Sequence, residues 1–241
     1  MRFAVLALLS LLAWPAQAQV LPVREVADGF AKTVFGAEFG GGGIGEALGL
    51  APTYLRRFEG PVRAAIIDTS RRRGRTRTVA NFLRYLDAKV APLRLSIVRD
   101  PARANLRIYV VDRKDYAATV RDKVFRSRFA TVRGKCVVRS QFTRAGISES
   151  AAVIVSDEGD ALFRRCMAEE VMQALGPLND DASLRRSMFN DNSRFTAPQR
   201  FDLLILRMLY DPSVRSGMTL DALRPRLPAL ARRAMRAIPP G

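Results

Sequence analysis

The sequence contains no histidine, the residue that most often acts as a general base near neutral pH and that commonly ligates zinc. A cysteine nucleophile activated by histidine is therefore excluded. The only tryptophan is Trp14, in the apolar stretch that opens the chain, so the remainder offers no tryptophan for stacking on carbohydrate. Beyond that stretch, no run is long and apolar enough for a membrane-spanning helix of about 20 residues.

The first 18 residues have the pattern of a secretory signal peptide. Arg2 precedes an uncharged apolar run, Phe3 to Trp14, and Ala16-Gln17-Ala18 forms an A-x-A cleavage site. We expect cleavage after Ala18, which predicts a periplasmic or secreted protein without a transmembrane segment in the mature chain. No cysteine lies near the cleavage site, which excludes a lipid anchor there.

Acidic residues are few relative to basic ones. The chain has 40 lysine and arginine residues against 23 aspartate and glutamate residues, a formal net charge of +17. Such a surface attracts polyanions over long distances. Outside the cytoplasm these are anionic envelope components such as lipopolysaccharide and lipid headgroups, so no nucleic acid partner is expected. The alternative is that the arginines are solvated surface residues without a binding role.

The two cysteines, Cys136 and Cys166, are predicted to form a disulfide, because a single pair of thiols in an oxidising compartment is usually bridged. The bridge would attach a strand-like segment to the start of the helix that carries Glu169 and Glu170. By constraining the unfolded chain, it would contribute on the order of 3 kcal/mol to stability.

Glycine separates two parts of the mature chain. Residues 19–57 are interpreted as an N-terminal extension with a short helix before residue 35 and a flexible glycine-rich linker at Gly40–Gly45. A phosphate-binding loop is the alternative for these glycines, but no convincing strand precedes them and no helix follows. We expect one domain over residues 58–241.

Hydrophobic periodicity in this domain predicts an α+β fold with one strand, one helix, four strands and then helices. The strands are expected at 61–68, 93–99, 104–112, 134–142 and 150–157, and the main helices at 77–90, 158–175, 197–210 and 220–238. Residues 115–129 form a helix or a mobile loop. The last helix is basic and amphipathic, and we expect it to start near Pro228 and to pack on its own domain rather than on a membrane.

The segment 166–181, CMAEEVMQALGPLNDD, resembles a zinc-peptidase signature without its zinc ligands. The metzincin pattern H-E-x-x-H-x-x-G-x-x-H has its counterparts at Glu169, Glu170, Gln173, Gly176 and Asn179. Met188, in RRSMFND, stands where the Met-turn would lie. The similarity implies a zincin-like mixed β-sheet with a long motif helix and a helical C-terminal part.

A wider set of motifs follows in one order over about fifty residues. These are C-x-x-E-E-x-x-Q-x-L-G from Cys166, N-D at Asn179-Asp180, S-M-F-N-D from Ser187, L-x-L-R-x-L-Y-D-P from Leu204 and G-M at Gly217-Met218. Together they resemble the domain of unknown function 2927 family, exported bacterial proteins without an established activity.

The substituted positions argue against a zinc site, and no metal or cofactor is predicted. Zinc requires His, Cys or carboxylate ligands. The amide oxygens of Gln173 and Asn179 would favour Ca²⁺ or Mg²⁺ if they bound a cation. Asp202 and Asn190 are expected to cap helices rather than to ligate a cation.

Two interpretations remain for the acidic pair on the motif helix. In one, Glu170 is a general base whose pKa is raised by burial beside a second carboxylate. In the favoured one, Glu169 and Glu170 pair with arginines, and Gln173 and Asn179 bind backbone groups near Gly176. The candidates for these arginines are Arg164, Arg165 and Arg185.

The sequence therefore predicts an exported, zincin-like protein, more plausibly non-catalytic than a peptidase, that binds an envelope component or a partner protein. The alternative is a hydrolase that uses Glu170 with a non-zinc cation or without a metal. A third hypothesis is a basic adaptor on the envelope surface, with salt-sensitive binding to anionic lipid or lipopolysaccharide.

Overall fold

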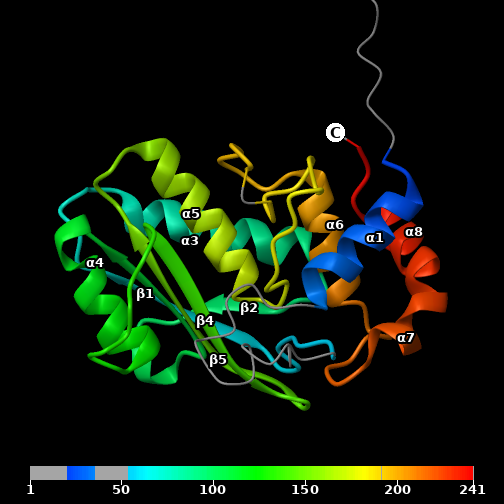
Figure 1. The fold of residues 1–241 in the computed structure, drawn as a ribbon, viewed down its shortest axis with the longest axis horizontal. Helices are drawn as coiled ribbons and strands as arrows, with labels where there is room; N and C mark the ends of the chain where they lie inside the picture. The colour runs from blue at the N-terminus through cyan, green and yellow to red at the C-terminus, as the bar shows by residue number, and fades with distance from the viewer. Residues whose placement is uncertain (1–20, 36–53, 191, 241) are drawn as a thin grey trace, which may run out of the picture.

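The computed structural model of the chain describes residues 21–35, 54–190 and 192–240. A five-stranded mixed β-sheet with the strand order β2-β1-β3-β5-β4 forms one half of it (Figure 1). The strands are β1 (Val62–Asp68), β2 (Leu95–Ile97), β3 (Leu106–Val111), β4 (Cys136–Thr143) and β5 (Gly146–Val155). Four strands are parallel, and β4 pairs antiparallel with β5 at one edge.

Helices cover both faces of the sheet and build the other half. Those beside the sheet are α3 (Arg75–Lys89), α5 (Asp160–Gln173) and α4 (Arg113–Thr119), which continues as a π-helix (Val120–Phe125). Those of the helical half are α1 (Val23–Val34), α6 (Arg200–Leu209), α7 (Leu220–Leu223) and α8 (Leu227–Ala237). Short 3₁₀ turns occur at Pro101–Arg103 and Arg224–Arg226. The predicted α+β class and helical C-terminal part are confirmed.

The sheet separates two hydrophobic cores, because successive side chains of a strand point to opposite faces. In β3, Leu106, Ile108 and Val110 lie in the main core, on the face that α3 and α5 cover. Val111 belongs to a smaller core with Tyr116 of α4. The segment predicted as helix or loop is thus helical as far as Phe125, because its apolar residues cover this second face.

Strand β5 is longer than its apolar run suggested. It begins at Gly146, and Ile147 pairs with Phe142 of β4 across a tight hairpin. The first four residues of the strand are mixed in polarity, because this end of the hairpin is only partly covered. Hydrophobic runs therefore marked its buried part and missed its start.

Helix α1 packs in the main core with α6 and α8. Val26, Phe30 and Val34 of α1 are fully buried. Helix α8 packs its apolar face against these helices, as predicted, so that face is covered by its own domain. The expected domain boundary at residue 58 falls inside this packing, because residues 54–57 are also largely buried.

In the described part of the chain, no helix is long and apolar enough to cross a membrane. The expected signal peptide and the glycine-rich linker at Gly40–Gly45 lie outside the described residues.

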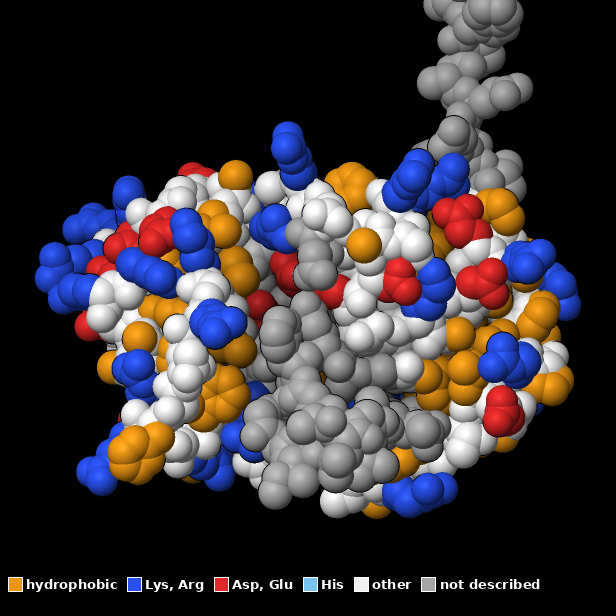
Figure 2. Space-filling view, in the orientation of Figure 1, with side chains coloured by type: hydrophobic (Ala, Val, Ile, Leu, Met, Phe, Trp, Pro, Cys, Tyr) orange, Lys and Arg blue, Asp and Glu red, His pale blue; other side chains and the backbone are white. Residues whose placement is uncertain are grey.

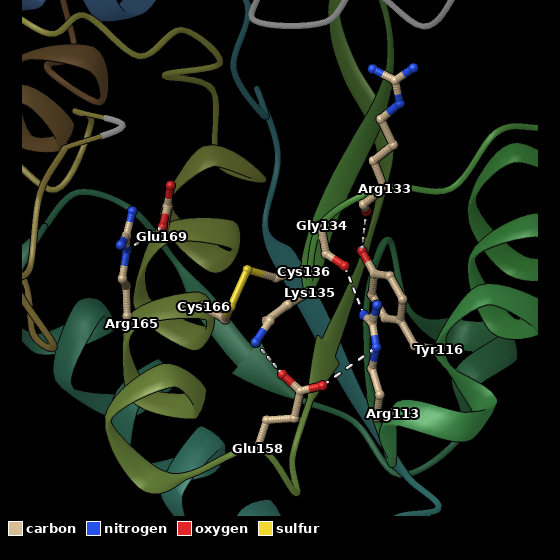
Figure 3. Close-up of a disulfide and its surroundings, with 10 residues drawn as sticks. All are labelled: Arg113, Tyr116, Arg133, Gly134, Lys135, Cys136, Glu158, Arg165, Cys166 and Glu169. Atoms are coloured by element: carbon tan, nitrogen blue, oxygen red, sulfur yellow. Dashed lines mark hydrogen bonds and ion pairs between the residues drawn. A yellow bond between two sulfur atoms is a disulfide. The ribbon is translucent and has the colours of Figure 1, made fainter.

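The predicted disulfide is confirmed. Cys136 at the start of β4 is bonded to Cys166 in the middle of α5, with the two Cα atoms 5.7 Å apart (Figure 3). Beside it, Glu158 pairs with Lys135 at 2.5 Å and with Arg113 at 3.4 Å. The edge strand and the motif helix are therefore joined by a covalent bond, and the ion pairs of Glu158 join the segment before α5 to the residue before β4 and to α4.

Removing this bond should lower stability. The bridged cysteines are 30 residues apart, and a loop of that length corresponds to about 3 to 4 kcal/mol in the chain-entropy description. We expect reductant to lower the urea-derived free energy of unfolding by that amount. A Cys136→Ala/Cys166→Ala variant should start at the lower value and not respond to reductant, so a response from this control would contradict the assignment.

Candidate functional site

The motif helix α5 ends where its chain meets the segment before β1. Gly176 has a φ of +135°, and a Cβ at this position would lie 2.5 Å from the carbonyl oxygen of Arg56. Its backbone N–H donates to the carbonyl of Gln173 at 2.9 Å. The turn glycine identified in the sequence is thus required for a left-handed backbone and a close approach.

The first ligand-equivalent position, Glu169, is in an ion pair. Its carboxylate lies 3.5 Å from the Nε of Arg165, one helical turn earlier (Figure 3). The two side chains are mostly buried, which weakens screening by solvent relative to an exposed pair. The arrangement is that of the favoured interpretation, in which an arginine holds this carboxylate.

The next residue, Glu170, is buried, with 6% of its surface exposed. Burial and then the negative charge of Glu170 raise the pKa of Tyr116, so the carboxylate acts electrostatically on this phenol. The Tyr116 hydroxyl donates to the carbonyl of Arg133 at 3.3 Å. A buried carboxylate of this kind is suited to structural pairing or to proton transfer.

The remaining ligand-equivalent positions bind neighbouring protein groups. Gln173 donates through Nε2 to Asp180 Oδ1 at 3.1 Å. Asn179 donates through Nδ2 to the carbonyl of Lys32 at 2.9 Å and through its backbone N–H to that of Thr33 at 3.2 Å. These are carbonyls of the last turn of α1, which have no partner within that helix.

Met188 marks a buried turn that is pinned to α6. Its backbone N–H donates to Asp202 Oδ1 at 3.0 Å, and Ser187 Oγ donates to the same oxygen at 2.6 Å. The backbone N–H of Gln199 donates to Asp202 Oδ2 at 2.7 Å, completing a capping box. Asn190 donates to the carbonyls of Ala182 and Leu184 instead of capping a helix.

The environment of Asp202 changes its acidity. Complete burial raises the pKa of this carboxyl to about 6, although the three hydrogen bonds act in the opposite direction. Desolvation therefore dominates, since removing a carboxylate from water favours its neutral form.

A pair of residues before β1 was missed by sequence reasoning. Arg57 is bonded to Glu59 at 3.0 Å and donates to the carbonyls of Leu209 and Asp211 at the end of α6. Its neighbour Arg56 is fully buried, with its guanidinium 4.6 Å from the ring centroid of Phe142. The spacing of Arg57 and Glu59, which places both on one side of an extended chain, was the available signal.

Two surface grooves beside α6 and α8 lie away from the motif residues. Two adjoining grooves of about 420 and 630 Å³ are lined by α6, α8 and the segments beside them, including Asp211, Pro212 and Arg233. None of the residues from Glu169 to Met188 lines them. Among the residues that the structure describes, no three His, Cys, Asp or Glu side chains are grouped as a metal site.

A family model described as protein of unknown function (DUF2927) matches residues 23–229, which is most of the chain. Its match begins at the first residue of α1 and includes all the motif residues. Comparison with curated proteins gave no match.

The close approach at Gly176 predicts a large effect of a single methyl group. Gly176→Ala should lower the free energy of unfolding by more than about 2 kcal/mol, because it combines a strained φ with a clash against the Arg56 carbonyl. The matched control is Gly60→Ala, at a glycine with open space around its Cβ position and no positive φ. The control should change the urea-derived value by less than about 1 kcal/mol. Equal effects would contradict the contact.

Asp202 predicts a distinctive pH dependence. Its pKa in the folded state, about 6, is higher than in the unfolded chain, so its contribution to stability is complete below about pH 4 and is lost as pH rises through 6. The unfolding free energy of the wild type minus that of Asp202→Asn should fall by on the order of 3 kcal/mol from pH 4 to pH 7. The control is Asp221→Asn, which removes one exposed carboxylate and so gives the effect of the lost charge alone on the free energy of unfolding. A flat difference would refute the raised pKa.

Proposed function

The chain belongs to the family of proteins of unknown function DUF2927, and on that premise we propose that it is an exported, zincin-like binding protein without zinc-peptidase chemistry. Its partner is an envelope component or another protein.

One observation carries this proposal. The three positions that would hold zinc histidines contain side chains that are engaged within the fold: Glu169 with Arg165, Gln173 with Asp180, and Asn179 with the end of α1. Asn179 in particular satisfies a backbone carbonyl of another helix. Moving such groups onto a cation would leave their present partners unsatisfied, which costs free energy.

The architecture supports the zincin-like part of the proposal. The mixed sheet, the long helix α5 that follows its last strand and the helical C-terminal half are the arrangement implied by the motif similarity. The disulfide between Cys136 and Cys166 supports export, because such bonds persist in oxidising compartments.

The charge supports an anionic partner. Lysine and arginine side chains occur over much of the face in Figure 2, at both the sheet half and the helical half. With a net charge of +17, the protein experiences long-range attraction to the phosphate groups of an envelope surface.

A hydrolase is the second candidate, and the burial of Glu170 favours it. A side chain with 6% of its surface exposed is shielded from bulk water, as the carboxylate of a general base in an enclosed site would be. The fold of an active enzyme and that of a binding protein would be the same, so the two functions are separated only by experiment.

Metal content is the direct test. We expect mass spectrometry of the purified protein to find no stoichiometric metal, and EDTA, Zn²⁺, Ca²⁺ and Mg²⁺ to shift the melting temperature by less than about 1 °C, since only a bound ligand stabilises the folded state. Stoichiometric zinc with peptidase activity that EDTA abolishes would refute the proposal.

Substitution of the acidic pair tests the hydrolase. Glu170→Gln should leave any activity found in a broad hydrolase screen unchanged, as should its matched control Glu169→Gln. If Glu170→Gln alone abolished turnover while its melting curve stayed cooperative, the result would support the hydrolase and refute the non-catalytic binding protein.

A further inference from the structure

The loop 126–135, which joins the π-helix to β4, presents an aromatic ring to solvent. Phe129 is 80% exposed, whereas the other exposed large apolar side chains of the described residues, Tyr85 and Ile97, are 38% and 41% exposed. An exposed apolar side chain alone needs no explanation. Phe129 differs because the fold holds its position and because of the charges around it.

The backbone of this loop is anchored on both sides of Phe129. Arg121 Nε donates to the carbonyl of Ala130 at 3.1 Å, and the N–H of Ala130 donates to Ser127 at 3.2 Å. Farther along, Tyr116 and Arg113 donate to two more loop carbonyls, those of Arg133 and Gly134 (Figure 3). Val132 packs against the second core. The turn with Phe129 is thus a built feature of the fold.

Arg126, at the start of the loop, has a φ of 51°, and it is the only non-glycine residue with a positive φ among those described. A left-handed backbone at such a residue is unfavourable and persists only where surrounding contacts impose it. Here it turns the chain out of the π-helix immediately before Ser127, Arg128 and Phe129. The backbone strain therefore serves the outward position of the turn.

The sequence on both sides of Phe129 is basic. From Lys123 to Ser148 the sequence has seven basic residues and no acidic one. Arg126 is paired with Glu149, and Lys135 with Glu158. Arg128 lies over the ring of Phe129, 4.6 Å from its centroid.

Arg133 extends its guanidinium away from the other labelled residues in Figure 3, and it has no hydrogen bond or ion pair from that group to a described residue. With Arg128, it leaves two guanidinium groups of the loop available to phosphate oxygens. Guanidinium binds phosphate through paired, charge-assisted hydrogen bonds.

We propose that the loop 126–135 docks on an anionic lipid bilayer, with Phe129 inserted at the boundary of headgroups and acyl chains and with Arg128 and Arg133 on lipid phosphates. Aromatic rings and arginines are stabilised together at that boundary. This inference rests on the export that the proposed function includes, which places the protein beside the envelope membranes.

The composition of the loop selects a bilayer over a protein partner. A stable protein interface buries about 800 Å² on each side around an apolar centre. The loop offers one exposed ring among cations instead. A single apolar wedge with basic residues is sufficient for reversible attachment to an anionic surface, where each basic residue contributes separately.

Vesicle binding tests the loop directly. The mature protein, beginning after Ala18, should co-sediment with phosphatidylglycerol/phosphatidylcholine vesicles, less at higher salt, and not with phosphatidylcholine alone. Arg128→Gln/Arg133→Gln should weaken binding about 30-fold, from about 1 kcal/mol for each basic residue at the surface. Phe129→Ser should weaken it about tenfold, the equivalent of about 1.4 kcal/mol.

The matched control removes two charges at the opposite end of the molecule. Arg232 and Arg236 are exposed on α8, far from α4 and the loop in Figure 1, and Arg232→Gln/Arg236→Gln has the same net charge as the loop variant. It should weaken binding less than about threefold, because charges beyond a Debye length are screened. Equal losses in the two variants would show diffuse attraction and overturn the proposal.

A fluorescent reporter gives the depth of the ring. Because Trp14, the only tryptophan of the sequence, lies in the expected signal peptide, Phe129→Trp places a single reporter in the mature protein, in the loop. Its emission should shift to the blue on phosphatidylglycerol vesicles and be quenched by brominated acyl chains. An unshifted spectrum on vesicles that do bind the protein would overturn insertion.

Other occupants give other outcomes. If Phe129→Ser dissociated an oligomer in sedimentation velocity, the ring would belong to an interface between copies, and the bilayer proposal would fail.

The outcome of the vesicle experiments is independent of the proposed function. Subcellular fractionation tests export, and metal content tests the absence of zinc chemistry. Loss of vesicle binding alone would leave a protein or soluble envelope component as the partner.

Discussion

The structure depends on the buried segment before β1, which joins the sheet to the helical half. Leu55 exchanges backbone hydrogen bonds with the segment 217–218, and the carbonyl of Arg57 accepts from the N–H of Ile147 in β5. The Arg57 guanidinium donates to a carbonyl at the end of α6. Because Gly176 has no side chain, the end of α5 can lie against the carbonyl of Arg56. Because buried backbone groups need hydrogen-bond partners, this one segment holds four parts of the chain that are distant in sequence.

This constraint determines what the motif helix can do. Helix α5 is bonded to β4 through Cys166 and is held at its end by the contact of Gly176 with Arg56. The residues that follow the helix then close onto α1 through Asn179. Glu169 and Gln173 are engaged within this segment, by Arg165 and Asp180, and Asn179 joins it to the helical half. A binding function at another surface is compatible with such an arrangement, because it requires no change in these contacts.

The second face of the sheet carries the loop that we propose as a binding surface. The small core around Tyr116 and Val153 supports α4, and it also anchors the basic loop 126–135 through Val132. The motif helix and the basic loop are thus on opposite sides of the same sheet, connected by β4 and the disulfide. Rigid presentation of a few cationic and aromatic side chains reduces the entropy lost on binding.

The sequence by itself determined the α+β class, the order of the main strands and helices and the Cys136–Cys166 pair, because hydrophobic periodicity and the count of cysteines are properties of the sequence alone. It also marked Gly176 as the turn after the motif helix, whereas the contact with Arg56 that requires glycine there is tertiary. Only the tertiary structure decided the partners of Gln173 and Asn179, the burial of Asp202 and the place of α1 in the core. These features depend on which segments pack together in the fold, and the periodicity of a sequence does not say which segments those are. The start of β5 and the exposed ring of Phe129 were likewise decided by cross-strand pairing and loop anchoring.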